Sequence, residues 1–208
     1  MRFRYFFWDF DGTLYNTYPF VVEDFSKALR DAGLCVPESG LLKMLKNTLR
    51  ETAHDLGGSE EKADEIIRRY SEYADSRNSA ALPIYPLADE ALRTVCEKGG
   101  QNYLYTHRNL SSIEALEHDG LWTYFADSVT SLDGFAHKPA PDALNHLIDK
   151  HNLPRAACCM VGDRSIDLDA GRNAGISPVL FDPDGFCLNY DTPYRFNNFK
   201  DFIRWLKA

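Results

Sequence analysis

The stretch that decides the fold is Trp-Asp-Phe-Asp-Gly-Thr-Leu, residues 8–14, which follows an aromatic run typical of a buried strand. Side chains in a strand repeat every two residues, so Asp9 and Asp11 are predicted to point the same way. Gly12 lets the backbone turn sharply and approach a ligand closely. Because unpaired charge is costly to desolvate, two aligned carboxylates indicate a bound cation. A strand-end turn with solvated aspartates is the simpler alternative.

Three later segments also place polar side chains beside apolar ones. Thr106 and Asp163 each close a strand-like segment, and Lys138 stands just before a helical pattern. Asp167 lies four residues after Asp163, which puts both on one side at the opening of a helix. Ligands of open α/β sheets bind at the C-terminal ends of the strands, so Asp9, Thr106 and Asp163 are predicted to lie at one edge.

The remaining patterns divide the chain in two. Between residues 17 and 82 the patterns are helical, with stretches that end near residues 33, 49, 58 and 76. From residue 83 onward strands and helices alternate, as in parallel βαβ units. We therefore predict an α/β fold with a Rossmann-like parallel sheet, whose core (1–16 and 83–208) carries an inserted helical cap domain (17–82). The core strands are expected at 101–106, 127–130, 156–161 and 178–181, with helices at 87–97, 111–117, 141–151, 165–174 and 197–207.

Taken together, the segments around Asp9, Thr106, Lys138 and Asp163 resemble the four signature motifs of the haloacid dehalogenase superfamily, in order and in rough spacing. This is a large group of mostly Mg²⁺-dependent phosphohydrolases, and the resemblance covers nearly the whole chain. With its helical insertion, the chain is similar to the phosphoglycolate phosphatase and beta-phosphoglucomutase group. One departure is Asn16, which stands where the family often has an acid.

The resemblance implies a catalytic role for three residues. Asp9 would attack phosphorus and form an aspartyl-phosphate, and Asp11 would protonate the leaving oxygen and later activate water. Lys138 would neutralise the phosphate and Asp9 together, although a surface lysine before a helix gives the same local pattern. The dehalogenases of the superfamily lack the second aspartate, so its presence favours phosphatase or phosphomutase chemistry.

The resemblance also implies a metal site for Mg²⁺, an ion that prefers oxygen ligands and keeps several waters. Its protein ligands would be the Asp9 carboxylate, the Asp11 backbone carbonyl and the Asp163 carboxylate. Asp167 is expected to act on the metal through water or from the second shell of ligands.

Three residues are the candidates for substrate binding. Thr106 would hydrogen-bond a phosphoryl oxygen, helped by backbone N–H groups near Gly12 and His107. For the His107 side chain, a place in an exposed loop fits the sequence as well as contact with substrate does. In the insertion, Lys43, Lys46 and Arg50 form the only basic cluster that could serve in substrate specificity, and a solvated helix face is the preferred interpretation.

Net charge, cysteine pattern and hydropathy limit the classes of binding partner and the cellular location that we expect. The net charge of −8 argues against a nucleic acid held by a wide basic face. The five cysteines lack metal-site spacing and are interpreted as reduced thiols. The charge at Asp9 comes too early for a signal peptide, and no apolar stretch is long enough to span a membrane. A cytoplasmic monomer or homodimer is expected.

Three functions stay open. The first is a phosphatase for a small phosphorylated metabolite of phosphoglycolate or sugar-phosphate size, under a mobile cap. The second is a phosphomutase of the beta-phosphoglucomutase type with the same core. The third is a binding module that turns nothing over, against which the intact set of charged residues argues.

Overall fold

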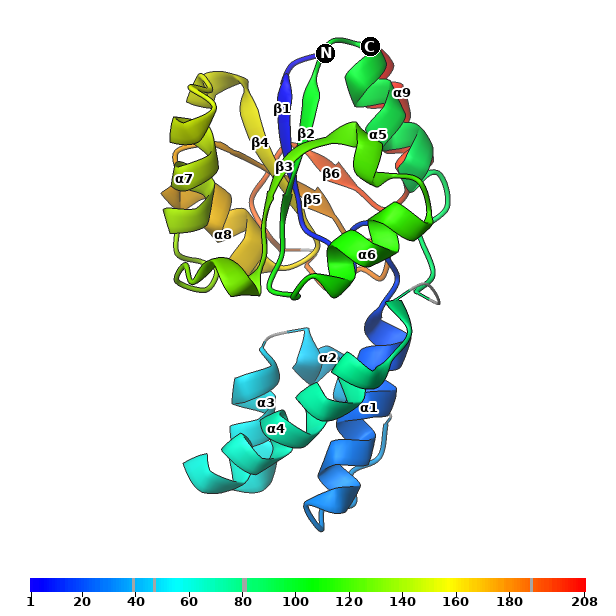
Figure 1. Ribbon diagram of the computed structural model, residues 1–208, viewed down its shortest axis with the longest axis vertical. Helices are drawn as coiled ribbons and strands as arrows, with labels where there is room; N and C mark the ends of the chain where they lie inside the picture. The colour runs from blue at the N-terminus through cyan, green and yellow to red at the C-terminus, as the bar shows by residue number, and fades with distance from the viewer. Residues whose placement is uncertain (39, 47, 80–81, 188) are drawn as a thin grey trace. The chain divides into compact units, whose positions relative to one another are not determined.

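The computed structural model of the protein describes residues 1–38, 40–46, 48–79, 82–187 and 189–208. The chain folds into two units, which are coloured along the chain in Figure 1. One unit consists of Met1–Asn16 and Leu82–Ala208, and the other of Thr17–Ala81. Each is described separately below.

The first unit is built on a parallel sheet in the order β3-β2-β1-β4-β5-β6. This confirms the predicted α/β fold with a parallel sheet. Strand β6 was not predicted, because its two residues are too few to show a pattern. The strands are β1 (Tyr5–Trp8), β2 (Gln101–Tyr105), β3 (Phe125–Val129), β4 (Cys158–Gly162), β5 (Ser177–Phe181) and β6 (Arg195–Phe196).

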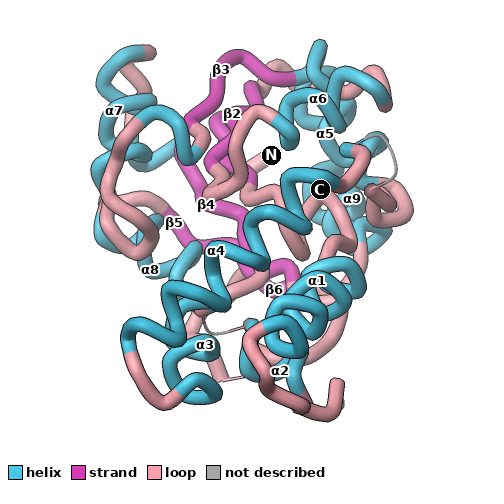
Figure 2. The backbone as a smooth tube through the Cα atoms, turned by 60° about the horizontal axis from the view of Figure 1, so that its bottom comes forward, coloured by secondary structure: helices cyan, strands magenta, loops and turns pink. Residues whose placement is uncertain are grey.

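Helices cover both faces of this sheet, as Figure 2 shows for α7 and α8 on one side and α5 and α9 on the other. Alternation along β1 explains the arrangement. Phe7 stacks on Tyr103 in a cluster with residues of α7 and α8, whereas Phe6 and Trp8 meet Phe202 of α9. The helices are α5 (Ala88–Glu97), α6 (Ser111–His118), α7 (Asp142–Lys150), α8 (Ser165–Asn173) and α9 (Phe199–Lys207), with 3₁₀ turns at Trp122–Tyr124, Ser131–Asp133 and Arg155–Ala157.

The second unit is helical. Its helices are α1 (Tyr18–Asp31), α2 (Leu41–Leu45), α3 (Leu49–Gly57) and α4 (Glu60–Ser76). The single helix predicted up to residue 49 is wrong, since α2 is only five residues long. The reason is Thr48, whose side chain accepts the N–H of Glu51 and so begins α3 instead. The start of the predicted stretch, Ser39, lies outside the described residues.

The predicted solvated face holds for Lys43 and Arg50, which are exposed, but not for Lys46. The Lys46 side chain is buried, with Nζ 3.8 Å from the centroid of the Tyr18 ring. Arg50 pairs with Glu60 at 2.6 Å and with Asp64 at 2.8 Å. The prediction was wrong for Lys46, which directly follows the buried Leu45 and is buried itself, with its charge placed over an aromatic ring. Within the described residues, no helix is long and apolar enough to cross a membrane.

Candidate active site

The predicted site residues lie where the central strands end. Asp9 directly follows β1 and Thr106 directly follows β2, and both extend the sheet ladder. The N–H of Asp9 donates to Val161 O at 2.9 Å, and that of Thr106 donates to Val129 O at 3.0 Å. Asp163 follows β4 in the same way. The parallel sheet therefore brings these residues to its C-terminal edge, as open α/β sheets do for their ligand-binding groups.

A buried lysine joins two of the carboxylates. Lys138 Nζ lies 2.6 Å from Asp9 Oδ1 and 2.8 Å from Asp167 Oδ1. It also donates to Tyr105 O at 2.9 Å and lies 4.4 Å from the centroid of that ring. The exposed fractions of the three charged side chains are 0% for Lys138, 3% for Asp9 and 0% for Asp167. Such a group is stable only as a set, because each charge loses its water on burial.

Burial and mutual charge shift the pKa of each member. At Asp9, burial and the charge of Asp167 outweigh Lys138 and raise the pKa of the carboxyl to about 7. At Asp167, burial is outweighed by Lys138 and Arg164, so the pKa falls below its usual value. At Lys138, the two carboxylates outweigh burial and raise the pKa above that of an ordinary lysine. In the metal-free protein a proton is therefore held more tightly at Asp9 than at Asp167, whose carboxylate pairs with Lys138.

The carboxylates fit a divalent cation. Asp9, Asp163 and Asp167 are buried, and each offers an oxygen within 4.8 Å of the others. In the described part of the chain, Asp9 Oδ2 accepts no hydrogen bond. When all three carboxylates are ionised they outnumber the cations Lys138 and Arg164, and an oxygen-preferring ion such as Mg²⁺ would offset the remaining negative charge.

The turn into α8 fixes Asp167. Its Oδ2 accepts the backbone N–H of Arg164 at 3.1 Å and so caps the helix. Gly162 makes room for this side chain, since a Cβ at that position would lie 2.3 Å from Asp167 Cβ. A glycine at the end of β4 is therefore required by the position of the carboxylate.

Asp11 has a different environment from Asp9. Strand β1 ends at Trp8, so the two-residue alternation on which their common direction was predicted does not continue to Asp11. The Asp11 carboxylate binds Arg108, from Nη2 to Oδ1 at 2.6 Å and from Nε to Oδ2 at 3.3 Å. The Asp11 side chain is 28% exposed and that of Arg108 is 17% exposed. Sequence reasoning missed this pair because nothing local marks a contact across 97 positions.

The predicted substrate-binding residues differ in whether their hydrogen-bond donors are already used within the protein. Thr106 is buried and its Oγ1 accepts the N–H of Arg108 at 3.0 Å, so its hydroxyl proton can be donated elsewhere. The N–H of Gly12, which has φ of +77°, donates to Tyr15 O at 2.8 Å.

The His107 ring is turned to the lysine segment. Its Nε2 accepts the backbone N–H of Lys138 at 3.0 Å, and the ring meets His137 edge to face at 4.6 Å. Burial and the charge of Lys138 lower the pKa of His107 to about 3, so the ring is neutral at physiological pH. The side chain therefore supports Lys138.

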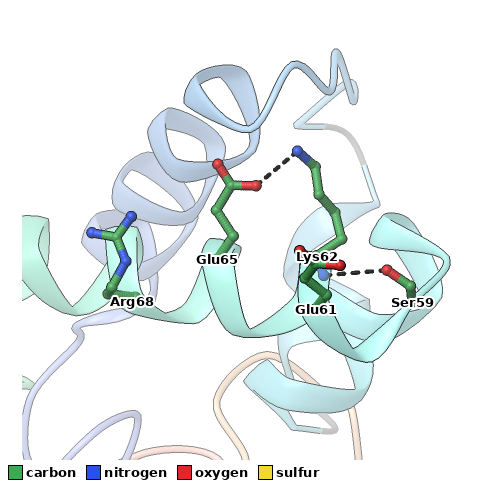
Figure 3. Close-up of a pocket in the computed structure, with 5 residues that line it drawn as sticks. All are labelled: Ser59, Glu61, Lys62, Glu65 and Arg68. Carbon is green, nitrogen blue, oxygen red and sulfur yellow. Dashed lines mark hydrogen bonds and ion pairs between the residues drawn. The ribbon is translucent and has the colours of Figure 1, made fainter.

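A surface hollow on the helical unit contains none of these residues. It is lined by residues of α4 and its N-cap, and Figure 3 shows the ion pair of Lys62 with Glu65 at 2.8 Å and the hydrogen bond from the Lys62 N–H to Ser59 at 3.2 Å. These polar groups are partnered with one another, so the hollow adds nothing to the site.

The sequence is similar to a hydrolase family model and to curated phosphatases. The family model described as haloacid dehalogenase-like hydrolase matches residues 6–181. A phosphoglycolate phosphatase from Vibrio vulnificus is 26% identical over 202 residues, covering 91% of this chain and 83% of the relative. The pyrophosphatase PpaX from Bacillus cereus is 26% identical over 181 residues, covering 84% and 81%.

Solved structures share the fold. A predicted phosphatase from Clostridium acetobutylicum superimposes with a TM-score of 0.84 at 20% identity, covering 100% of this chain and 99% of the other. A haloacid dehalogenase-like family protein from Streptococcus pneumoniae gives a TM-score of 0.84 at 16% identity, covering 98% of each chain.

Proposed function

This chain belongs to the haloacid dehalogenase-like hydrolase family and is a phosphoric monoester hydrolase, and we propose that it is a Mg²⁺-dependent phosphatase that works through an aspartyl-phosphate on Asp9. Its substrate is a small phosphorylated metabolite of phosphoglycolate or sugar-phosphate size, in keeping with the names of its relatives. The observation that carries the proposal is the buried set in which Lys138 bridges Asp9 and Asp167.

Asp9 is suited to nucleophilic attack. Its Oδ1 is held by Lys138, while Oδ2 accepts no hydrogen bond from the described residues and is the oxygen we assign to the attack on phosphorus. The attack forms the Oδ2–P bond as the bond from phosphorus to the leaving oxygen breaks. Asp11 donates a proton to that oxygen, then takes one from the water that hydrolyses the aspartyl-phosphate, which regenerates Asp9 and releases phosphate.

The Asp9 and Asp163 carboxylates, with the Asp11 backbone carbonyl, would hold Mg²⁺, and Asp167 would act directly or through water. When bound, Mg²⁺ supplies positive charge that keeps the nucleophile ionised and offsets the charge of the phosphoryl oxygens. Lys138 adds a second positive charge to the same oxygens.

For the substrate phosphoryl group, Thr106 is the donor we assign, because its hydroxyl proton is available. Gly12 lies in the turn that follows β1, and His107 lies in the loop that follows β2. We propose the helical insertion, residues 17–82, as the cap that sets substrate size. None of the five cysteines forms a disulfide within the described residues, which fits a reducing compartment such as the cytoplasm.

The test is phosphate release from a panel of phosphorylated metabolites, with Mg²⁺ and with EDTA. Asp9→Asn should abolish release, while Asp55→Asn, at a side chain that is 70% exposed, should keep it. Acid quenching of the wild type during turnover should add one phosphoryl group to the peptide that contains Asp9. Normal Mg²⁺-dependent release by Asp9→Asn would refute the assignment. An isomerised sugar phosphate in place of free phosphate would indicate a mutase, and binding without product would indicate a binding module.

A further inference from the structure

The ion pair between Asp11 and Arg108 conflicts with the role proposed for Asp11. The guanidinium holds both carboxylate oxygens, at 2.6 Å and 3.3 Å. A carboxylate held in this fork is stabilised as an anion and is directed at the arginine. An acid that protonates the leaving group must instead point to the oxygen that departs from phosphorus as Asp9 attacks. The pair must therefore break in every turnover.

Arg108 is well anchored at its backbone. Its N–H donates to Thr106 Oγ1 at 3.0 Å, and its carbonyl accepts the N–H of Ser131 at 3.0 Å. The guanidinium carbon lies 5.5 Å from the centroid of the Phe10 ring, the residue between the two aspartates. Because the loop is fixed beside the proposed phosphoryl donor, the guanidinium stays near the substrate when its partner changes.

We propose that Arg108 is an anion-exchange site, at which a second anionic group of the substrate takes the place of Asp11. The exchange releases Asp11 for proton transfer and seats the substrate at the same time. The inference rests on the proposed function and names its substrate class, which is phosphate esters whose leaving group carries a carboxylate or a second phosphoryl group. Both groups match the two parallel N–H donors that the Asp11 carboxylate now occupies.

The exchange makes two predictions of opposite sign. A substrate without a second anion must break the pair without compensation, so wild-type enzyme turns it over slowly. Loss of the guanidinium removes the binding site for the anionic substrate but also removes the ion pair that directs Asp11 at Arg108, so the neutral substrate should be turned over faster. Simple attraction of anions to a positive charge predicts no such gain.

The experiment compares 2-phosphoglycolate with 2-hydroxyethyl phosphate, in which a hydroxymethyl group replaces the carboxylate, and uses ethylene glycol bisphosphate for the phosphoryl case. Wild type should prefer 2-phosphoglycolate over 2-hydroxyethyl phosphate at least tenfold in kcat/KM, or ethylene glycol bisphosphate if the second anion is phosphoryl. In Arg108→Gln the preference should vanish, with 2-hydroxyethyl phosphate about fivefold faster than in wild type, since a partly exposed ion pair contributes about that factor. Arg93→Gln, which breaks an exposed pair with Glu97, is the matched control.

Outcomes separate this inference from the proposed function. Equal kcat/KM for all three compounds in wild type would overturn the exchange and leave the phosphatase intact. An equal loss for every compound in Arg108→Gln would also overturn it, provided that thermal melting shows a folded variant. Arg108→Lys, which keeps charge but loses the fork, should fall between wild type and Arg108→Gln. Absence of Mg²⁺-dependent release from any compound in wild type would overturn the proposed function and the exchange together.

Discussion

Replacement of Lys138 by methionine should destabilise the metal-free protein strongly and in a pH-dependent manner. The substitution keeps the buried stem and removes the ammonium, which leaves Asp9 and Asp167 without their shared cation. Breaking a buried ion pair by removing one partner typically costs about 3–5 kcal/mol. The loss cannot grow without limit, because a buried carboxylate can take up a proton instead.

The cost of this protonation therefore sets an upper limit on the loss of stability. Protonation of a carboxyl costs about 1.4 kcal/mol for each pH unit above its ordinary pKa near 3.9. For Asp167, which is ionised in the wild type, the cost is at most about 5 kcal/mol at pH 7.5 and about 1.5 kcal/mol at pH 5. With about 2–4 °C per kcal/mol for a chain of this size, Tm should fall by about 10–20 °C at pH 7.5 and by about 3–6 °C at pH 5.

The assay is thermal unfolding in EDTA at both pH values, followed by near-ultraviolet circular dichroism. Lys150→Met is the matched control, because Lys150 pairs with Asp127 at 2.7 Å but is 52% exposed, and such a pair contributes about 1 kcal/mol or less. A Tm for Lys138→Met within about 3 °C of wild type at pH 7.5 would refute the reasoning. So would a loss of equal size at both pH values.

Three other predictions concern the same site. The added methyl group of Gly162→Ala should push against Asp167, which should lower the free energy of unfolding in urea by about 1–3 kcal/mol and also lower kcat. A variant as active and as stable as wild type would contradict the geometry. His107→Leu should lower kcat with little change in KM, because the backbone N–H of Lys138 loses the ring nitrogen that accepts it. His107→Gln should recover most of kcat, because the glutamine side chain offers that N–H an acceptor again. Since the pKa of Asp9 is raised to about 7, folding takes up a proton there, so the stability that Asp9 contributes to the metal-free protein is present at low pH and is lost as pH rises through about 7. Urea unfolding in EDTA should lose about 3 kcal/mol between pH 5 and pH 8, and Asp9→Asn should remove this slope.

The sequence was most informative where local pattern and topology agree. Asp9, Thr106 and Asp163 each follow a run of buried strand residues, and a parallel sheet places such positions at one edge whatever the loops between them do. Helix α4 was equally predictable, because Ser59 accepts the N–H of Lys62 and so marks its first turn.

The sequence was least informative where a contact depends on distant partners. Nothing near Asp11 indicates Arg108, and nothing near Lys46 indicates the ring of Tyr18. The direction of the His107 ring is decided by an N–H that lies 31 positions away. Such contacts follow from the packing of loops, which obeys no short period.

The place of β1 in the sheet has a consequence for synthesis of the chain. Strand β1 is synthesised before the other strands of its sheet but occupies an inner place, and Tyr5 pairs with Gln101 and Cys158. The helices of Thr17–Ala81, by contrast, have their packing partners within their own segment. Contacts between residues that are close in sequence favour fast folding. The helical unit can therefore form on the nascent chain before β4 has been synthesised and can pair with β1. The site around Asp9, the proposed nucleophile, is thus completed only after β4 has been made, although Asp9 precedes β4 by about 150 residues.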